Sequence, residues 1–205
     1  MKIYDVSRPV DTCPPYPGDP APSFARLREI ETDGYELTGI TATLHAGTHV
    51  DAPAHFIPGG KTIGELDPGL FFGACEVIDT RGGVVTGKFV NDVVHPGCLR
   101  VLFKGNGASY VNETAVAVLK SFGVELVGTD ALSIASPGNE AAVHKLMLGE
   151  GIAVIEGLDL SVVRPGRYIL SAAPVNIGAK EAAPCRALLM SGSINIYVPD
   201  EDEYA

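Results

Sequence analysis

The chain of 205 residues contains no tryptophan, only four cysteines and few basic residues. None of the cysteines forms a C-x-x-C pair, which disfavours a structural zinc ribbon, and we expect four reduced thiols. No apolar run is long enough to cross a bilayer or to form a signal peptide near Met1, so we expect no membrane contact and a cytoplasmic location. The 15 Lys and Arg against 25 Asp and Glu give a net charge of −10, which argues against nucleic acid as a partner.

The sequence lacks the motifs that usually activate a catalytic serine or cysteine. There is no G-x-S-x-G elbow, and no histidine is adjacent to Cys13, Cys75, Cys98 or Cys185. A chain of this length suits one domain, 1–205, and buries about 70% of its unfolded surface without disulfide support. With 46% hydrophobic residues, 24 glycines and 15 prolines, the composition is typical of a compact enzyme rich in turns.

Four side chains that can bind a metal or carry a proton fall within eleven residues: His45, His49, Asp51 and His55. All four occupy odd-numbered positions, which share one side of an extended segment. On a strand the backbones of His49 and Asp51 would lie about 6.6 Å apart, close enough to share an ion, but His45 and His49 would lie about 13 Å apart. Because ligand bonds are about 2 Å long, the chain must bend between them, and Gly47 permits the bend.

A helix with His45 and His49 one turn apart is the competing interpretation, as in zinc proteases. It is disfavoured because no Glu follows the first His, Gly47 weakens a helix and Pro53 ends one. Residues 38–44 alternate and are rich in β-branched side chains, which predicts a strand that ends at His45, followed by a bent loop. Three histidines and one aspartate in phase around a glycine favour a metal site over isolated surface histidines.

A single carboxylate, Glu156, interrupts the apolar segment 152–158. A strand here would bury it, and an unpaired buried charge is costly, so Glu156 needs a cation, a proton or several donors. A metal meets that need, and an ion pair with Arg186 is the alternative. His144 lies nearby on a helix predicted over 141–148, where a histidine alone would more often be a core residue. His95, before Pro96, is expected to be a surface residue that binds no metal.

Hydropathy and breaker residues predict alternating strands and helices, and hence a mixed α/β fold. The expected strands are 2–6, 24–30, 35–44, 74–79, 99–103, 124–127 and 152–158. The expected helices are a short one over 61–66 and longer ones over 113–122 and 141–148. The proline-rich segment 7–22 is expected to be a stiff loop, and the acidic tail 199–205 to be loose.

The segment from His45 to His55 resembles the signature HxGTHxDxPxH of the metal-dependent cyclase family, whose best-known members resemble bacterial kynurenine formamidase. The resemblance continues through the Pro-Gly-Asp turn at 17–19, through 128–130, and through a His and a Glu twelve residues apart, at 144 and 156. It implies a single layered β/β/α domain of the swivelling type and association as a homodimer or homotetramer. Asp130 either orients a ligand or caps a turn.

The resemblance also implies the roles of the site residues. The metal ligands would be His45, His49, Asp51, His144 and Glu156. In this arrangement Asp51 and Glu156 bridge to a second metal, and His55 donates and accepts protons. Nitrogen and oxygen ligands without thiolates suit Zn²⁺, as two ions, with Mn²⁺ as the alternative.

Kynurenine formamidases of this family carry a Trp before the Pro-Gly-Asp turn, where it stacks on the aromatic substrate. This chain has Tyr16 there, and because a Tyr can also stack, Tyr16 is expected to contact an aromatic small-molecule substrate. The predicted reaction is arylformamidase-like hydrolysis of a small amide, formamide or lactam by metal-bound hydroxide, with His55 moving the proton. A cyclic-amide or lactone hydrolase similar to isatin hydrolase, and a metal-binding protein without turnover, are the alternatives.

Overall fold

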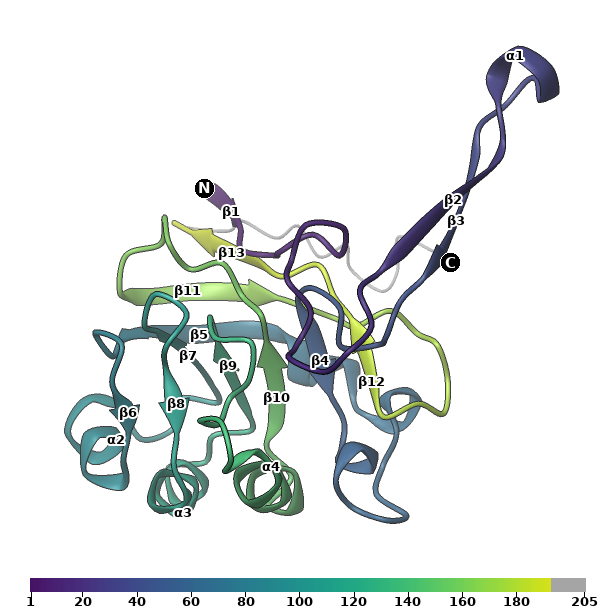
Figure 1. The fold of residues 1–205 in the computed structure, drawn as a ribbon. Helices are drawn as coiled ribbons and strands as arrows, with labels where there is room; N and C mark the ends of the chain where they lie inside the picture. The colour runs from purple at the N-terminus through teal and green to yellow at the C-terminus, as the bar shows by residue number, and fades with distance from the viewer. Residues whose placement is uncertain (193–205) are drawn as a thin grey trace, which may run out of the picture.

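The computed structural model describes residues 1–192, in which a mixed, curled sheet of nine strands separates two hydrophobic cores (Figure 1). The predicted loose tail, 199–205, lies outside the described residues. The strands run across the sheet in the order β1 (Lys2–Asp5), β13 (Leu188–Ser191), β11 (Gly166–Ser171), β5 (Phe72–Asp79), β7 (Arg100–Lys104), β9 (Leu126–Thr129), β10 (Ala153–Glu156), β4 (His49–Asp51) and β12 (Ala182–Pro184). Neighbours among β5, β7, β9 and β10 are parallel, and the other pairs are antiparallel.

Three helices cover one face of the parallel strands: α2 (Gly87–Val93), α3 (Glu113–Ser121) and α4 (Glu140–Gly149) (Figure 1). On β7, Val101 and Phe103 face the helices, while Leu102 faces the second core on the other side of the sheet. Both faces are therefore buried, which explains why this strand reads as a continuous apolar run. Helix α3 begins where predicted because the Asn112 side chain accepts a hydrogen bond from the backbone N–H of Ala115. The predicted mixed α/β class is confirmed.

A hairpin of β2 (Ser23–Arg28) and β3 (Leu37–Thr41) projects away from the sheet, with α1 (Ile30–Asp33) at its tip (Figure 1). We call this segment, 23–41, the arm. Its large apolar side chains are exposed: Phe24, Leu27, Ile30, Tyr35, Leu37 and Ile40. An isolated two-stranded hairpin is marginally stable in water. Within residues 1–192 no segment covers the exposed apolar side chains of the arm.

The shorter elements complete the chain. Strands β6 (Val84–Val85) and β8 (Tyr110–Val111) form a small parallel pair, and single 3₁₀ turns occur at η1 (Pro53–His55), η2 (Ile63–Glu65) and η3 (Pro68–Phe71). The short helix expected over 61–66 is thus the turn η2. All four cysteines are free thiols, as expected. None of the helices in the described part of the chain has the length and hydropathy of a membrane span.

Candidate metal centre

The centre is built on β4 and on the tight turn that precedes it. Gly47 has φ of +71°, and a Cβ atom there would lie 2.8 Å from the carbonyl oxygen of Arg8, so only glycine fits. The predicted bend at this glycine is confirmed. The prediction that His45 ends a strand is wrong, because β3 stops at Thr41 and belongs to the arm. The order is the reverse: His45 lies in the turn, and His49 and Asp51 lie on a strand.

Strand pairing brings Glu156 to the motif from more than a hundred residues away. Strand β4 is paired with β10 on one side and β12 on the other, and Glu156 lies directly opposite His49 in the β10–β4 register. Directly opposed residues point to the same face of the sheet. The distance from His49 Nε2 to Glu156 Oε2 is accordingly 3.5 Å.

Helix α4 supplies His144 from the layer above the sheet. Its Nδ1 atom lies 2.7 Å from the carbonyl oxygen of Glu140, one turn earlier in the helix, and therefore donates to it. That bond leaves Nε2 facing Glu156 Oε1 at 3.0 Å and Asp51 Oδ2 at 3.5 Å. The ring of Phe56 stacks on the imidazole, with centroids 4.7 Å apart.

His49 is oriented in the same manner as His144. Its Nδ1 donates to the carbonyl oxygen of Gly47 at 3.0 Å, and its Nε2 points into the cluster. A histidine whose second nitrogen is held by a backbone carbonyl presents a fixed lone pair, which is the usual arrangement of a metal-binding imidazole. His45 completes this side, with Nδ1 at 3.1 Å from Asp51 Oδ1.

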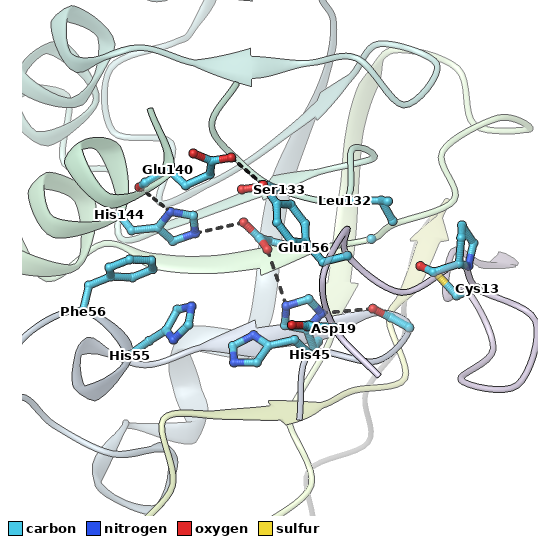
Figure 2. Close-up of a pocket in the computed structure, with 15 residues that line it drawn as sticks. Cys13, Asp19, His45, His55, Phe56, Leu132, Ser133, Glu140, His144 and Glu156 are labelled. Atoms are coloured by element: carbon cyan, nitrogen blue, oxygen red, sulfur yellow. Dashed lines mark hydrogen bonds and ion pairs between the residues drawn. The ribbon is translucent and has the colours of Figure 1, made fainter. Parts of the chain in front are cut away.

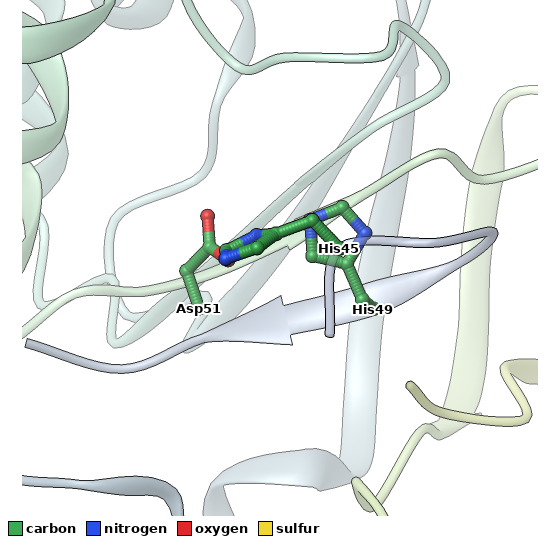
Figure 3. A group of neighbouring side chains, drawn as sticks. All are labelled: His45, His49 and Asp51. Carbon is green, nitrogen blue, oxygen red and sulfur yellow. The ribbon is translucent and has the colours of Figure 1, made fainter. Parts of the chain in front are cut away.

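Three buried polar atoms of the cluster have no hydrogen-bond partner within the described residues: His49 Nε2, Asp51 Oδ1 and Asp51 Oδ2. Leaving such groups unsatisfied costs about 1–3 kcal/mol each, and more for a charge. The candidate ligand atoms form two groups, each within 4.8 Å, and Asp51 is common to both (Figure 3 shows the first). The groups are His45, His49 and Asp51, and Asp51, His144 and Glu156. This donor set fits divalent metal ions.

The two buried carboxylates, Asp51 and Glu156, also determine the protonation of the histidines in the cluster. Burial alone would lower the pKa of His144, but the carboxylates of Asp51 and Glu156 outweigh it and raise that pKa to about 10. In the same way Glu156 and Asp51 raise the pKa of His49 to about 9 against the effect of burial. In the metal-free protein two imidazolium ions thus balance two carboxylates, and metal binding has to displace their protons.

His55 belongs to neither three-residue group. It lies on η1 at the edge of the cluster, with its ring centroid 4.3 Å from that of His45 and 5.8 Å from that of His144. Burial lowers the pKa of His55, so its imidazole is neutral at pH 7 and free to accept a proton. The structure therefore places the predicted proton carrier beside the predicted ligands.

The structure also bears on the hypotheses made for Arg186, Asp130 and His95. Arg186 forms an ion pair with Asp5 at the surface, so it is not the partner of Glu156. The Asp130 carboxylate accepts the backbone N–H of Gly105 and, among residues 1–192, forms no hydrogen bond or ion pair with a member of the cluster, which favours its role as a turn cap. His95 is exposed, as expected, but its Nδ1 pairs with Glu76 at 2.8 Å.

A cavity of about 240 Å³ opens above the cluster (Figure 2). Its lining includes the predicted residues Tyr16, His45, His49, His55, His144 and Glu156. It also includes residues to which sequence reasoning gave no role, namely Cys13, Pro14, Asp19, Phe56, Leu132, Ser133 and Glu140. The signal for Glu140 was present, since it precedes His144 by one helical turn. Tyr16 donates a hydrogen bond to Glu140, which ties the loop 7–22 to the start of α4.

Comparison with known proteins shows the same architecture elsewhere. Residues 4–136 match the family model described as "Putative cyclase". Kynurenine formamidase of Salinibacter ruber (strain DSM 13855 / M31) is 35% identical over 207 residues, covering 92% of this chain and 97% of that protein. A solved structure described as a potential metal-dependent hydrolase with cyclase activity is 31% identical, with a TM-score of 0.79 over 92% of this chain and 96% of that one. Isatin hydrolase A from Labrenzia aggregata, at 19% identity, shares the fold with a TM-score of 0.81, covering 92% of this chain and 93% of that one.

Proposed function

The chain belongs to the cyclase family, and from that premise we propose that it hydrolyses the C–N bond of a small aryl formamide with the help of bound metal. Relatives named kynurenine formamidase support hydrolysis of a non-peptide C–N bond. The observation that carries the proposal is the set of buried, unpartnered atoms of His49, which lines the cavity, and of Asp51, which is fully buried beside it. Hydrogen bonding within the described chain leaves them unsatisfied, and a cation would satisfy them.

Five residues would hold the metal: His45, His49, Asp51, His144 and Glu156. When bound, a divalent ion lowers the pKa of a coordinated water towards about 7 and polarises a carbonyl oxygen. Asp51 belongs to both groups of ligand atoms and would bridge two ions. The absence of thiolates from this donor set suits Zn²⁺, with Mn²⁺ as the alternative, and we propose two ions per chain.

His55 would move the proton. Its neutral imidazole lies beside the ligands but outside their two groups, so it can take a proton from the attacking water and return it to the leaving nitrogen. The walls around it are largely apolar, since Phe56, Leu132 and Pro14 line the cavity. Such walls exclude bulk water and suit an aromatic ring, against which Tyr16 can pack.

The test uses protein purified without chelators and analysed for metal. Hydrolysis of formanilide, N-formylkynurenine and isatin is then measured with added Zn²⁺ or Mn²⁺. We expect turnover of at least one formamide, reduced strongly in His55→Gln and unchanged in His95→Gln, a matched change at an exposed histidine. Turnover of isatin alone would instead support the lactam hydrolase. Metal binding without turnover of any of the three would overturn the proposal in favour of a metal-binding protein without catalysis.

A further inference from the structure

Two carboxylates line the cavity in addition to those of the ligand cluster. Asp19 comes from the loop 7–22, and Glu140 is the first residue of α4 (Figure 2). Both are partly exposed, whereas His49 and Glu156 are almost completely buried, at 3% and 5% exposed. The ligand cluster is therefore the floor of the cavity, and Asp19 and Glu140 lie nearer to solvent. A substrate whose scissile amide reaches the floor can direct the rest of its structure towards them.

No Lys or Arg side chain lines this cavity among residues 1–192. The guanidinium of Arg8 is turned away from it, donating to the carbonyl oxygens of Leu158 at 3.1 Å and Asp130 at 2.8 Å. Arg186 is engaged with Asp5 at the surface. Asp19 and Glu140 thus have no counter-charge from a lysine or arginine of the lining. The positive charges of the site, those of the histidines and of bound metal, lie at its buried floor.

Tyr16 keeps Glu140 in place and in its charged form. The phenol donates its proton in a hydrogen bond to the Glu140 carboxylate, which lowers the pKa of Glu140 and raises the pKa of Tyr16 to about 12. A carboxylate can accept several hydrogen bonds. Glu140 can therefore bind a substrate N–H or ammonium group while it remains bonded to Tyr16.

We propose that Asp19 and Glu140 set the charge specificity of the site: it takes aryl amides that are neutral or cationic away from the scissile bond and discriminates against anionic ones. This inference rests on the proposed hydrolase function. Ion pairs at partly exposed positions change binding by about twofold to fivefold each. Each carboxylate both attracts a cation and repels an anion, so we expect a preference for cation over anion of at least about tenfold.

The experiment uses the metal-loaded full chain and three formanilides that differ only at the para position: trimethylammonium, methyl and sulfonate. These substituents are cationic, neutral and anionic, and they are weak metal ligands. The wild type should show a kcat/KM at least about tenfold higher for the cation than for the anion. In Glu140→Gln and in Asp19→Asn this ratio should fall by about fivefold. Glu150→Gln, the same change at the exposed far end of α4, should leave the ratio at its wild-type value.

Binding of the corresponding para-substituted anilines, measured by calorimetry, gives a readout that needs no turnover. The same order of affinities is expected, with the same losses in the two variants. If no formanilide is hydrolysed, the proposed function fails, and the aniline affinities still decide the charge specificity. Equal affinities for the cationic and anionic anilines, or a ratio unchanged in both folded variants, would overturn the inference.

Discussion

Replacing Asp51 with Asn tests the metal centre at the residue on which both groups of ligand atoms depend. The carboxylate is 0% exposed, and neither of its oxygens has a hydrogen-bond partner within the described residues. It lies 3.1 Å from His45 Nδ1, 3.6 Å from His49 Nε2 and 3.5 Å from His144 Nε2. Asn preserves the shape but removes the negative charge and places an N–H₂ group where an ion needs a lone pair.

The size of the effect follows from linkage between binding and folding. A metal that binds only the folded chain, at a hundred times its Kd, stabilises it by about 2.7 kcal/mol. For a protein of this length about 1 kcal/mol moves Tm by roughly 2–4 °C. Each bound Zn²⁺ should therefore raise the Tm of the wild type by about 5–11 °C. In Asp51→Asn the shift should be close to zero, because neither group retains its shared anionic ligand.

The assay combines elemental analysis of the purified protein with calorimetric melting, with and without metal. Asp130→Asn is the matched control, since Asp130 is also buried but accepts a hydrogen bond from Gly105 at 2.9 Å. The control should melt at a lower temperature and keep both its metal and the metal-induced shift. Wild-type metal content and a full shift in Asp51→Asn would refute the shared-ligand assignment.

Further predictions concern the proton carrier, the turn and the arm. His55→Ala should retain nearly all its metal and lose about 10²- to 10⁴-fold in kcat; loss of metal as well would make His55 a ligand. Because burial lowers the pKa of His55 and a base works unprotonated, kcat in a pH titration should fall on the acid side with a midpoint below 6.5, the ordinary pKa of a histidine. In Gly157→Ala a Cβ would lie 2.8 Å from the carbonyl oxygen of Gly47, so metal affinity should fall, whereas Gly151→Ala, with a similar positive φ but open space, should lose stability alone. If the arm packs against a second copy of the chain, light scattering should give a dimer or tetramer for the wild type and a monomer for the double variant Leu27→Asp, Ile40→Asp. A monomeric wild type would contradict that assembly.

Local signals in the sequence predicted much of the framework. Helix α3 begins at its Asn112 cap, and β7 and β10 read as apolar runs because parallel strands are buried on both faces. The bend at Gly47 followed from the length of a ligand bond, which a straight strand cannot satisfy for His45 and His49. Each of these features is determined by interactions between residues that are close in the sequence, which is why the sequence predicts them.

The rest depended on contacts between distant residues. Strand β4 has three residues and exists because β10 and β12 pair with its two edges, so no pattern within 49–51 could reveal it. The arm shows the opposite case, a local pattern that does not reveal where the strand packs. Its alternation of apolar residues is real, but Ile40 is 58% exposed, because the hairpin leaves the body of the protein instead of joining the sheet.

The side chain of Thr48 connects the floor of the cavity to its rim, which is formed by Tyr16 and Asp19 of the loop 7–22. The Thr48 hydroxyl donates to the carbonyl oxygen of Gly157 at 2.6 Å and accepts the backbone N–H of Arg8 at 2.7 Å. It thus joins the metal-binding strand, the residue after Glu156 and the start of the loop that carries Tyr16 and Asp19. The floor lies on paired strands, whereas that loop lies on the surface, where sequence can change at little cost to the core. Substitutions at the rim can therefore alter which substrate enters while the ligand geometry below stays fixed.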